Sequence, residues 1–186
     1  MPEIIIEGVQ KTLGGLLTLR EITLVVEDRT VAGILGPSGC GKSTLFNIIS
    51  GLMKPDQGSI SIGGRDVTGK IGLVSYMRQK DLLLPSLDVL DNVGIPLVLK
   101  GTPRKKARAE AKKHLQAFGL KGFESYYPSQ LSGGMRQRAA MLRTYLFSSD
   151  IWLLDEPFAS LDAITKRKMH AWLTGVHFPF GDGEIG

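Results

Sequence analysis

The sequence predicts an α/β protein whose core is a parallel sheet with helices on both sides, together with an N-terminal antiparallel β lobe and an inserted helical lobe. A glycine-rich loop at residues 36–44 stands between an apolar run and a segment with helical character. A second apolar run, at residues 151–154, does not alternate with polar residues, which is typical of a strand buried on both faces of a parallel sheet. Residues 81–148, between these two features, have a mostly helical pattern.

We expect these parts to form a single domain. Of the 186 residues, 42% are hydrophobic and 22% are charged, which is ordinary for a globular protein with one sizeable core. The predicted parts are a β lobe with the first part of the core, the helical lobe, the second part of the core and an atypical tail. They lie at residues 1–80, 81–148, 149–173 and 174–186.

Composition also excludes several classes of protein. No apolar run approaches the about 20 residues that span a bilayer, and the N-terminus lacks the pattern of a secretory signal. The single cysteine, Cys40, excludes an intramolecular disulfide. The net charge is +5, and basic clusters can bind nucleic acid or anionic lipid. We favour a solvated helix face for the cluster at residues 104–113, because no aromatic residues for base stacking are interleaved with it.

Short β-prone runs bounded by glycine and turn residues predict the strands. These runs lie at residues 4–6, 22–26, 31–35, 59–62 and 71–76. Two helices are predicted at residues 43–50, with Gly51 as the stop signal, and at residues 87–99.

A third helix is predicted to begin at the pair Thr102 and Pro103, with the threonine as cap and the proline at the first helical position. Its apolar residues recur at helical spacing and are followed by a glycine that suits the C-terminal cap. These residues are Ala107, Ala111, Leu115, Phe118 and Gly119. A further helix is expected at about residues 163–173.

The glycine-rich loop fits the phosphate-loop pattern of glycine, four residues, then Gly-Lys-Ser/Thr. Backbone N–H groups of such a loop and of the following helix turn point at an anion, and the helix dipole favours negative charge there. Lys42 would reach the β- and γ-phosphates, and the hydroxyl of Ser43 would ligate Mg²⁺. The nucleotide-binding residues are therefore predicted to be Gly36, Pro37, Ser38, Gly39, Cys40, Gly41, Lys42, Ser43 and Thr44.

Two carboxylates end the apolar run at residues 151–154, where open α/β sheets place their ligands. Asp155 would hold Mg²⁺ through water, and Glu156 is placed to polarise an attacking water. The alternative is an acidic pair in a turn that ends the strand before Pro157. We favour the functional interpretation because a phosphate loop precedes this pair in the chain.

A second anion-binding helix start is predicted at Ser132, Gly133 and Gly134, where the serine can cap a helix and the glycines leave its first N–H groups unobstructed. One bound nucleotide needs only the phosphate loop. The second helix start can serve if two copies pair head to tail, each offering Ser132 to the other copy's γ-phosphate. The alternative is an ordinary capped helix.

Together these features resemble the nucleotide-binding subunit of an ABC transporter. The resemblance rests on the order of the phosphate loop, Gln79, the Leu-Ser-Gly-Gly sequence at residues 131–134, the apolar strand that ends at Glu156, and the Ser-Leu-Asp sequence at residues 160–162. Within the family, residues 82–85, 90–93 and 133–138 are similar to those of importers of nitrate, sulfonate, taurine and thiamine precursors.

The resemblance implies roles for particular residues. Glu156, Lys42 and Gln79 are expected to be catalytic, and Ser43, Gln79 and Asp155 to bind Mg²⁺. The expected cofactors are ATP and Mg²⁺. The expected partners are a second ATP-binding subunit, a membrane permease that docks a short helix at residues 79–86 and, indirectly, a solute-binding protein, with no nucleic acid. Residues 160–162 would cross the dimer interface, and the protein would lie at the cytoplasmic face of the cell membrane.

Three departures from the family pattern stand out. Leu13 occupies the position where an aromatic residue would stack on adenine, so we expect weaker adenine affinity or looser base selectivity. The turn at residues 27–30 lacks a glycine, and we expect only a local effect. Family members continue with a helix, a buried strand and a switch histidine, whereas residues 175–186 have no strand pattern and His177 lacks a preceding apolar strand.

From the third departure we expect a C-terminally truncated chain, without the last strands of the sheet, that binds ATP but hydrolyses it poorly. Two other functions stay open at this point. One is a soluble ABC ATPase of DNA repair or translation, and the other is a non-catalytic regulatory fragment.

Overall fold

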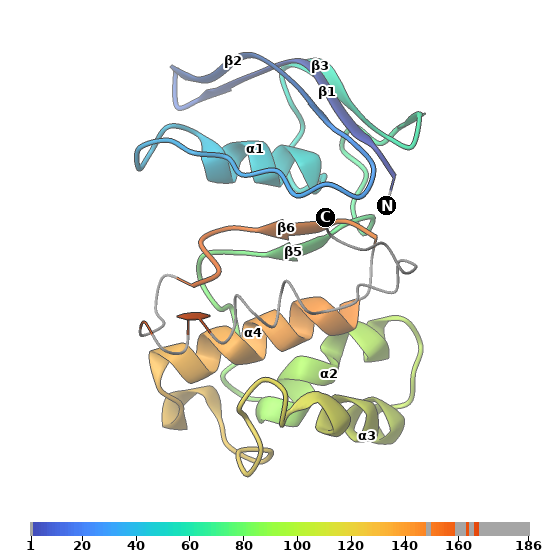
Figure 1. Cartoon of the computed structure of the whole chain (residues 1–186), viewed down its shortest axis with the longest axis vertical. Coiled ribbons are helices and arrows are strands. Elements are labelled where there is room, and N and C mark those ends of the chain that lie inside the picture. Colours follow the sequence, from blue (N-terminus) through green and yellow to red (C-terminus); the bar gives the residue numbers. More distant parts are fainter. Residues whose placement is uncertain (1, 148–149, 159–162, 164–165, 168–186) are drawn as a thin grey trace. The chain divides into compact units, whose positions relative to one another are not determined.

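The computed structural model of the chain describes residues 2–147, 150–158, 163, 166 and 167. The chain divides into two compact units, one from residues 1–76 and 149–155 and the other from residues 77–148 and 156–186 (Figure 1). The predicted interface loop at residues 160–162, the candidate switch histidine His177, most of the helix predicted at residues 163–173 and the predicted tail at residues 174–186 lie outside the described residues.

The first unit contains an antiparallel sheet in the order β2-β1-β3-β4. Its strands are β1 (Ile4–Leu13), β2 (Leu16–Val26), β3 (Gln57–Ile62) and β4 (Arg65–Asp66). Gly14 and Gly15, both with positive φ, make the turn between β1 and β2, which pair up to the last residue before that turn. The strands predicted at residues 4–6, 22–26 and 59–62 are confirmed.

The core strands form a separate two-stranded parallel sheet of β5 (Ser75–Met77) and β6 (Trp152–Leu154). The prediction for β6 is confirmed to within one residue. The prediction of a strand over residues 71–76 is correct only at its end, because Gly72 has a positive φ of 83° and the backbone around it is not extended. Helix α1 (Lys42–Ile49) also belongs to this unit and agrees with the prediction for residues 43–50.

The strand predicted at residues 31–35 is wrong. This segment forms no strand in the described part of the chain, and its side chains Val31 and Leu35 are 99% and 95% exposed. Ile34 alone packs partly against the core. The run has β-prone residues, but a strand needs a hydrogen-bonded neighbour, and none of the described residues pairs with it.

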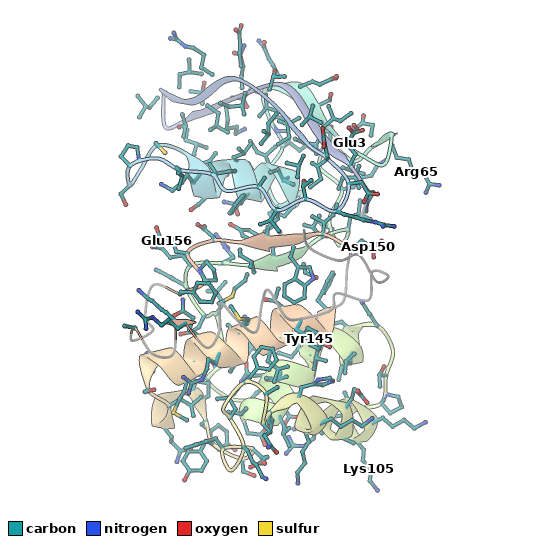
Figure 2. The ribbon with its side chains drawn as sticks, in the orientation of Figure 1. Glu3, Arg65, Lys105, Tyr145, Asp150 and Glu156 are labelled. Carbon is teal, nitrogen blue, oxygen red and sulfur yellow. The ribbon has the colours of Figure 1, made fainter. Side chains whose placement is uncertain are left out.

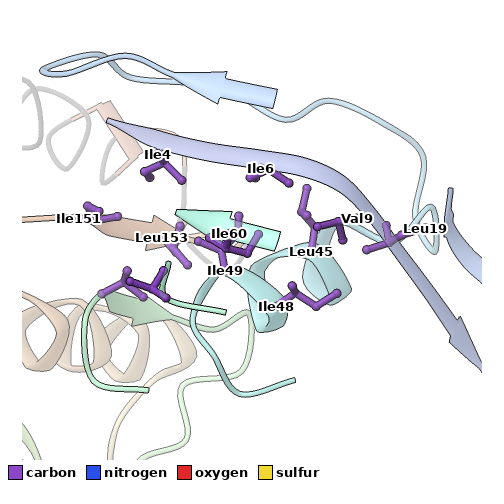
Figure 3. Close-up of a cluster of buried hydrophobic side chains, with 12 residues drawn as sticks. Ile4, Ile6, Val9, Leu19, Leu45, Ile48, Ile49, Ile60, Ile151 and Leu153 are labelled. Atoms are coloured by element: carbon purple, nitrogen blue, oxygen red, sulfur yellow. The ribbon is translucent and has the colours of Figure 1, made fainter. Parts of the chain in front are cut away.

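The core of the first unit lies between the antiparallel sheet and α1 (Figure 3). The antiparallel sheet contributes residues that alternate along its strands, and α1 contributes residues of one face. Leu153 of β6 and Ile151 just before it, together with Val67 and Val74 of the connecting segments, complete the core. This cluster is Ile4, Ile6, Val9, Leu19, Leu45, Ile48, Ile49, Ile60, Val67, Val74, Ile151 and Leu153. Because α1 contributes Leu45, Ile48 and Ile49, this packing fixes the helix whose first residue is Lys42.

The second unit is helical. It contains α2 (Val89–Leu99), α3 (Arg104–His114), a 3₁₀ turn η1 (Pro128–Gln130) and α4 (Gly133–Phe147), and α2 packs against both α3 and α4 (Figure 1). The helix predicted at residues 87–99 begins at Val89, because the side chain of Asp88 accepts a hydrogen bond from the N–H of Asp91 and caps it.

The start of α3 differs from the prediction. Thr102 is not the cap: Pro103 takes that position with an extended ψ of 137°, the helix begins at Arg104, and no side chain caps it. The predicted apolar face is confirmed, since Ala107, Ala111, Leu115 and Phe118 are all buried. The helix ends at His114, earlier than predicted, and Leu115 rather than Gly119 is its C-terminal cap. Gly119 has a left-handed φ of 64° in the turn that follows the helix. No helix within the described residues has the length and apolar character needed to cross a membrane.

Candidate functional site

The phosphate loop ends at Gly41, the residue before α1. Gly41 has a φ of 98°, and a Cβ atom placed on it would lie 2.7 Å from Cδ2 of Leu19 and 3.1 Å from the carbonyl oxygen of Thr18. Glycine is therefore required here both by conformation and by the close approach of β2. No side chain caps α1, so the N–H groups of its first turn are available to an anion.

Lys42 folds back over this loop. Its Nζ donates hydrogen bonds to the carbonyl oxygens of Gly36 at 2.7 Å and Pro37 at 2.8 Å, and Sγ of Cys40 lies 3.8 Å away. These neutral acceptors hold the ammonium group beside the loop. A phosphate there would offer charged acceptors, which form stronger hydrogen bonds with an ammonium group.

Ser43 and Asp155 meet in the first unit, as their predicted roles require. Oγ of Ser43 donates to Oδ2 of Asp155 at 2.6 Å, and the hydroxyl of Tyr76 lies 3.5 Å from the same oxygen. Asp155 is only 5% exposed. The fold thus places a hydroxyl and a buried carboxylate together at the start of α1 and the end of β6.

This pair fits Mg²⁺ in its donor chemistry, because a hydroxyl and a carboxylate are both oxygen ligands. Among the described residues no group of three or more His, Cys, Asp or Glu side chains could hold a metal by itself. Mg²⁺ commonly binds through one or two carboxylates together with substrate phosphates rather than in an all-protein cage. The residues therefore suit a metal that arrives with a nucleotide.

Gln79 and Glu156 meet in the second unit. Nε2 of Gln79 donates to Oε2 of Glu156 at 2.8 Å, and both side chains are exposed. Glu156, labelled in Figure 2, has a left-handed backbone with a φ of 50°. Left-handed backbone at a non-glycine residue is uncommon and is frequently found at functional sites.

Gln137, a third residue of this group, was not predicted from the sequence. Its Nε2 donates to the backbone carbonyl oxygen of Glu156 at 3.2 Å, and it is only 5% exposed. Gln137 lies three and four residues before the buried Ala140 and Met141 in α4. A polar residue on an apolar helix face is the sequence feature that could have identified it.

The helix start predicted at Ser132 is confirmed. Oγ of Ser132 accepts a hydrogen bond from the N–H of Met135 at 3.3 Å, and α4 begins at Gly133. This bond takes one N–H group of the first turn. The role of Ser132, Gly133 and Gly134 toward a nucleotide on a second copy stays a prediction.

Residues 79–86, the segment predicted to receive a permease helix, are held firmly by side chains of the helices. Asn92, which is fully buried, accepts a hydrogen bond from the N–H of Leu84 at 2.7 Å and donates one to its carbonyl oxygen at 3.0 Å. Arg143 donates to the carbonyl oxygens of Asp81 at 2.6 Å and Leu82 at 2.8 Å. The side chains of Leu82 and Leu84 are about half exposed. The segment thus presents apolar side chains on a fixed backbone.

A phosphate loop with a paired serine and aspartate, and a capped Leu-Ser-Gly-Gly helix start, define a nucleotide-binding protein of the ABC class. The family model described as ABC transporter matches residues 19–159. The chain belongs to this family.

Several curated relatives are named as import ATP-binding proteins. The chain is 49% identical over 158 residues to the formylaminopyrimidine import ATP-binding protein ThiZ of Halalkalibacterium halodurans, covering 85% of this chain and 61% of that protein. It is 41% identical over 165 residues to the taurine import ATP-binding protein TauB of Pseudomonas aeruginosa, with 89% and 63% covered. It is 40% identical over 178 residues to the sulfate/thiosulfate import ATP-binding protein CysA of Mycobacterium tuberculosis, with 94% and 50% covered. The chain thus spans between half and two thirds of the length of these relatives.

Solved structures of ABC cassettes have the same fold. A dimeric, post-hydrolysis structure of the ATP-binding cassette MJ0796 bound to ADP and Pi is 30% identical, with a TM-score of 0.83 over 91% of this chain and 81% of that one. The cassette MJ1267 is 24% identical, with a TM-score of 0.79 over 94% of this chain and 76% of that one, which supports the fold alone.

Proposed function

We propose that this protein is the ATP-binding subunit of an ABC importer, which binds MgATP, pairs head to tail with a second copy and couples ATP binding and hydrolysis to solute transport by a membrane permease. The observation that carries the proposal is the bond between Ser43 and Asp155 beside an uncapped phosphate-loop helix. It supplies the anion site and the oxygen ligands that a magnesium nucleotide needs.

In the proposed reaction the chain acts mainly by positioning and by stabilising charge. The loop N–H groups and Lys42 hold the phosphates of ATP, and Ser43 and Asp155 hold Mg²⁺, which would neutralise charge on the phosphate oxygens. Gln79 contributes a further oxygen ligand. Glu156 accepts a proton from the attacking water, while Ser132 of the second copy contacts the γ-phosphate. The carboxylate of Glu156 is exposed and accepts a hydrogen bond from Gln79, which supports its role as a base within reach of water.

Coupling to the permease is assigned to residues 79–86. The half-exposed leucines of this segment offer apolar contacts to a short helix, and Asn92 and Arg143 keep its backbone in place. We assign the protein to the cytoplasmic face of the membrane, with a solute-binding protein as an indirect partner. The names of ThiZ, TauB and CysA support import as the direction of transport.

The test is ATP binding and hydrolysis by the purified chain, with and without Mg²⁺. Lys42→Ala should weaken ATP binding at least 10-fold and abolish hydrolysis. Lys105→Ala, on the outward-facing side of α3 (Figure 2), is the matched control and should change neither. Hydrolysis that persists in Lys42→Ala would contradict the proposal. The same assay tests the predicted impairment of hydrolysis by comparing the rate of this chain with that of a related import ATP-binding protein.

A further inference from the structure

Two glutamine side chains hold opposite ends of Glu156. Gln79 donates to its carboxylate at 2.8 Å, and Gln137 donates to its backbone carbonyl oxygen at 3.2 Å. The carboxylate is exposed, whereas Gln137 is 95% buried within the helical unit. The reactive end of Glu156 is therefore open to solvent, while its backbone is tied to the interior.

The backbone of Glu156 needs such a tie. Its φ of 50° is left-handed, a conformation in which Cβ crowds the neighbouring carbonyl oxygen. A residue of this kind stays in place only where its surroundings fix it. The bond from Gln137 ends on the carbonyl group of this same residue, so it acts directly on the strained unit and on the direction in which the side chain leaves the backbone.

Helix α4 supports the partner of Glu156 as well. Arg136 donates from Nε to the carboxylate of Asp81 at 3.2 Å, and Arg143 donates to the backbone carbonyl oxygens of Asp81 and Leu82. These residues follow Gln79 closely in the chain. One helix therefore holds both the segment after Gln79 and, through Gln137, the backbone of Glu156, and the same helix begins next to Ser132.

We propose that Gln137 is a positioning residue for ATP hydrolysis. Its side-chain amide fixes the left-handed backbone of Glu156 and thereby sets the direction of the carboxylate. Because Gln137 belongs to α4, the position of this helix determines the position of the carboxylate. The inference rests on the proposed function, in which Glu156 is the base. It adds a link from the helix that carries Ser132 at its start to the base of the same chain. In this role Gln137 acts through the backbone of Glu156 and not by contacting the nucleotide.

The test uses Gln137→Met, which keeps the length of the side chain and removes the donor. We expect kcat for ATP hydrolysis to fall about 10-fold, with KM and the ATP dissociation constant changed less than twofold, because the phosphate loop is untouched. In a Glu156→Gln background the same substitution should change the residual rate less than twofold, since the carboxylate that Gln137 positions is already absent. Gln116→Met, at an exposed site, is the matched control and should leave all values unchanged.

A second readout does not depend on activity. Hydrogen exchange of the peptide around Glu156 should become about 5-fold faster in Gln137→Met, with the exchange of α4 unchanged. If exchange around Glu156 and kcat both stay at the wild-type level, the inference is wrong. It is also wrong if kcat falls by the same factor in the Glu156→Gln background, or if α4 itself loosens, because the role of Gln137 would then be general stability.

Failure of the proposed function gives a different result. In that case the wild-type chain shows neither ATP binding nor ATP hydrolysis that depends on Lys42. The exchange measurement then decides by itself whether Gln137 fixes the backbone of Glu156.

Discussion

The hydroxyl of Ser43 donates a 2.6 Å hydrogen bond to Oδ2 of Asp155, joining two residues that are 112 positions apart in the sequence. The bond brings the first turn of α1 to the end of β6 within one compact unit. The bond holds a hydroxyl and a carboxylate side by side, an arrangement that suits the proposed binding of Mg²⁺ together with a nucleotide.

Asp155→Asn tests this relationship. We expect ATP affinity in the presence of Mg²⁺ to fall about 10-fold, or about 1.4 kcal/mol, while affinity in EDTA changes little, because the phosphate loop stays intact. The unfolding temperature without ligand should not fall, since the change removes a charge at a site that is only 5% exposed. Calorimetric titration with ATP in both buffers is the measurement. Equal losses of affinity in Mg²⁺ and in EDTA would show that Asp155 acts on the loop rather than on the metal.

A substitution at Leu13 tests the predicted contact with the nucleotide base. It ends β1, pairs with Leu16 across the hairpin turn and is 38% exposed. Leu13→Tyr should tighten ATP binding by about 1 kcal/mol, roughly 5-fold, because an aromatic ring stacks on a base more strongly than leucine does. Leu16→Tyr, on the other side of the turn, is the control. The measurement is the affinity of Leu13→Tyr and of the wild type for ATP, GTP and inorganic triphosphate. If Leu13→Tyr gains as much affinity for inorganic triphosphate as for ATP, a contact with the base is ruled out.

The ion pairs of Asp91, at the start of α2, predict how the stability of the folded chain depends on pH. Hydrogen bonds from Arg104, and then from Arg108, lower the pKa of Asp91 to about 2 from its ordinary 3.8. A carboxylate whose pKa is lower in the folded state stabilises that state above its unfolded pKa, and this contribution is lost as the pH falls through the folded value. It should therefore be complete above about pH 4 and lost near pH 2.

Asp91→Asn should accordingly lower the free energy of unfolding by about 1 kcal/mol at pH 7, where water screens part of the attraction to the exposed Arg104. The difference from the wild type should shrink toward pH 2. Urea unfolding followed by helical circular dichroism at several pH values measures it, with Glu7→Gln on an exposed face of β1 as the control. A difference that stays constant down to pH 2 would mean that packing, not charge, is lost.

The turn after β2 predicts a stabilising substitution. Arg29 has a left-handed φ of 58°, in a turn closed by a hydrogen bond from the hydroxyl of Thr30 to the carbonyl oxygen of Glu27. Arg29→Gly should raise the free energy of unfolding by about 0.5 kcal/mol, because relief of the steric penalty exceeds the added entropy of the unfolded chain. Glu27→Gly, at a residue without positive φ, should lower it. Thermal unfolding of both variants checks the sign.

Much of the fold and of the candidate site could be predicted because the information is local. The phosphate loop, the helix after it and the cap at Ser132 are encoded by residues within a few positions of each other. The apolar face of α3 follows from spacing along one helix. The pairing of Ser43 with Asp155 was also predictable, since strand ends in an open α/β sheet gather their ligands at one edge.

Only the tertiary structure decided the features that depend on distant partners. The run at residues 31–35 has the residues of a strand, yet it forms none among the described residues, because hydrogen bonds to a neighbour and not propensity make a strand. The bond from Gln137 to the backbone of Glu156 could not be predicted for a similar reason. A buried amide shows in the sequence only as a polar residue on an apolar face, and the carbonyl group that it meets is set by how the chain packs.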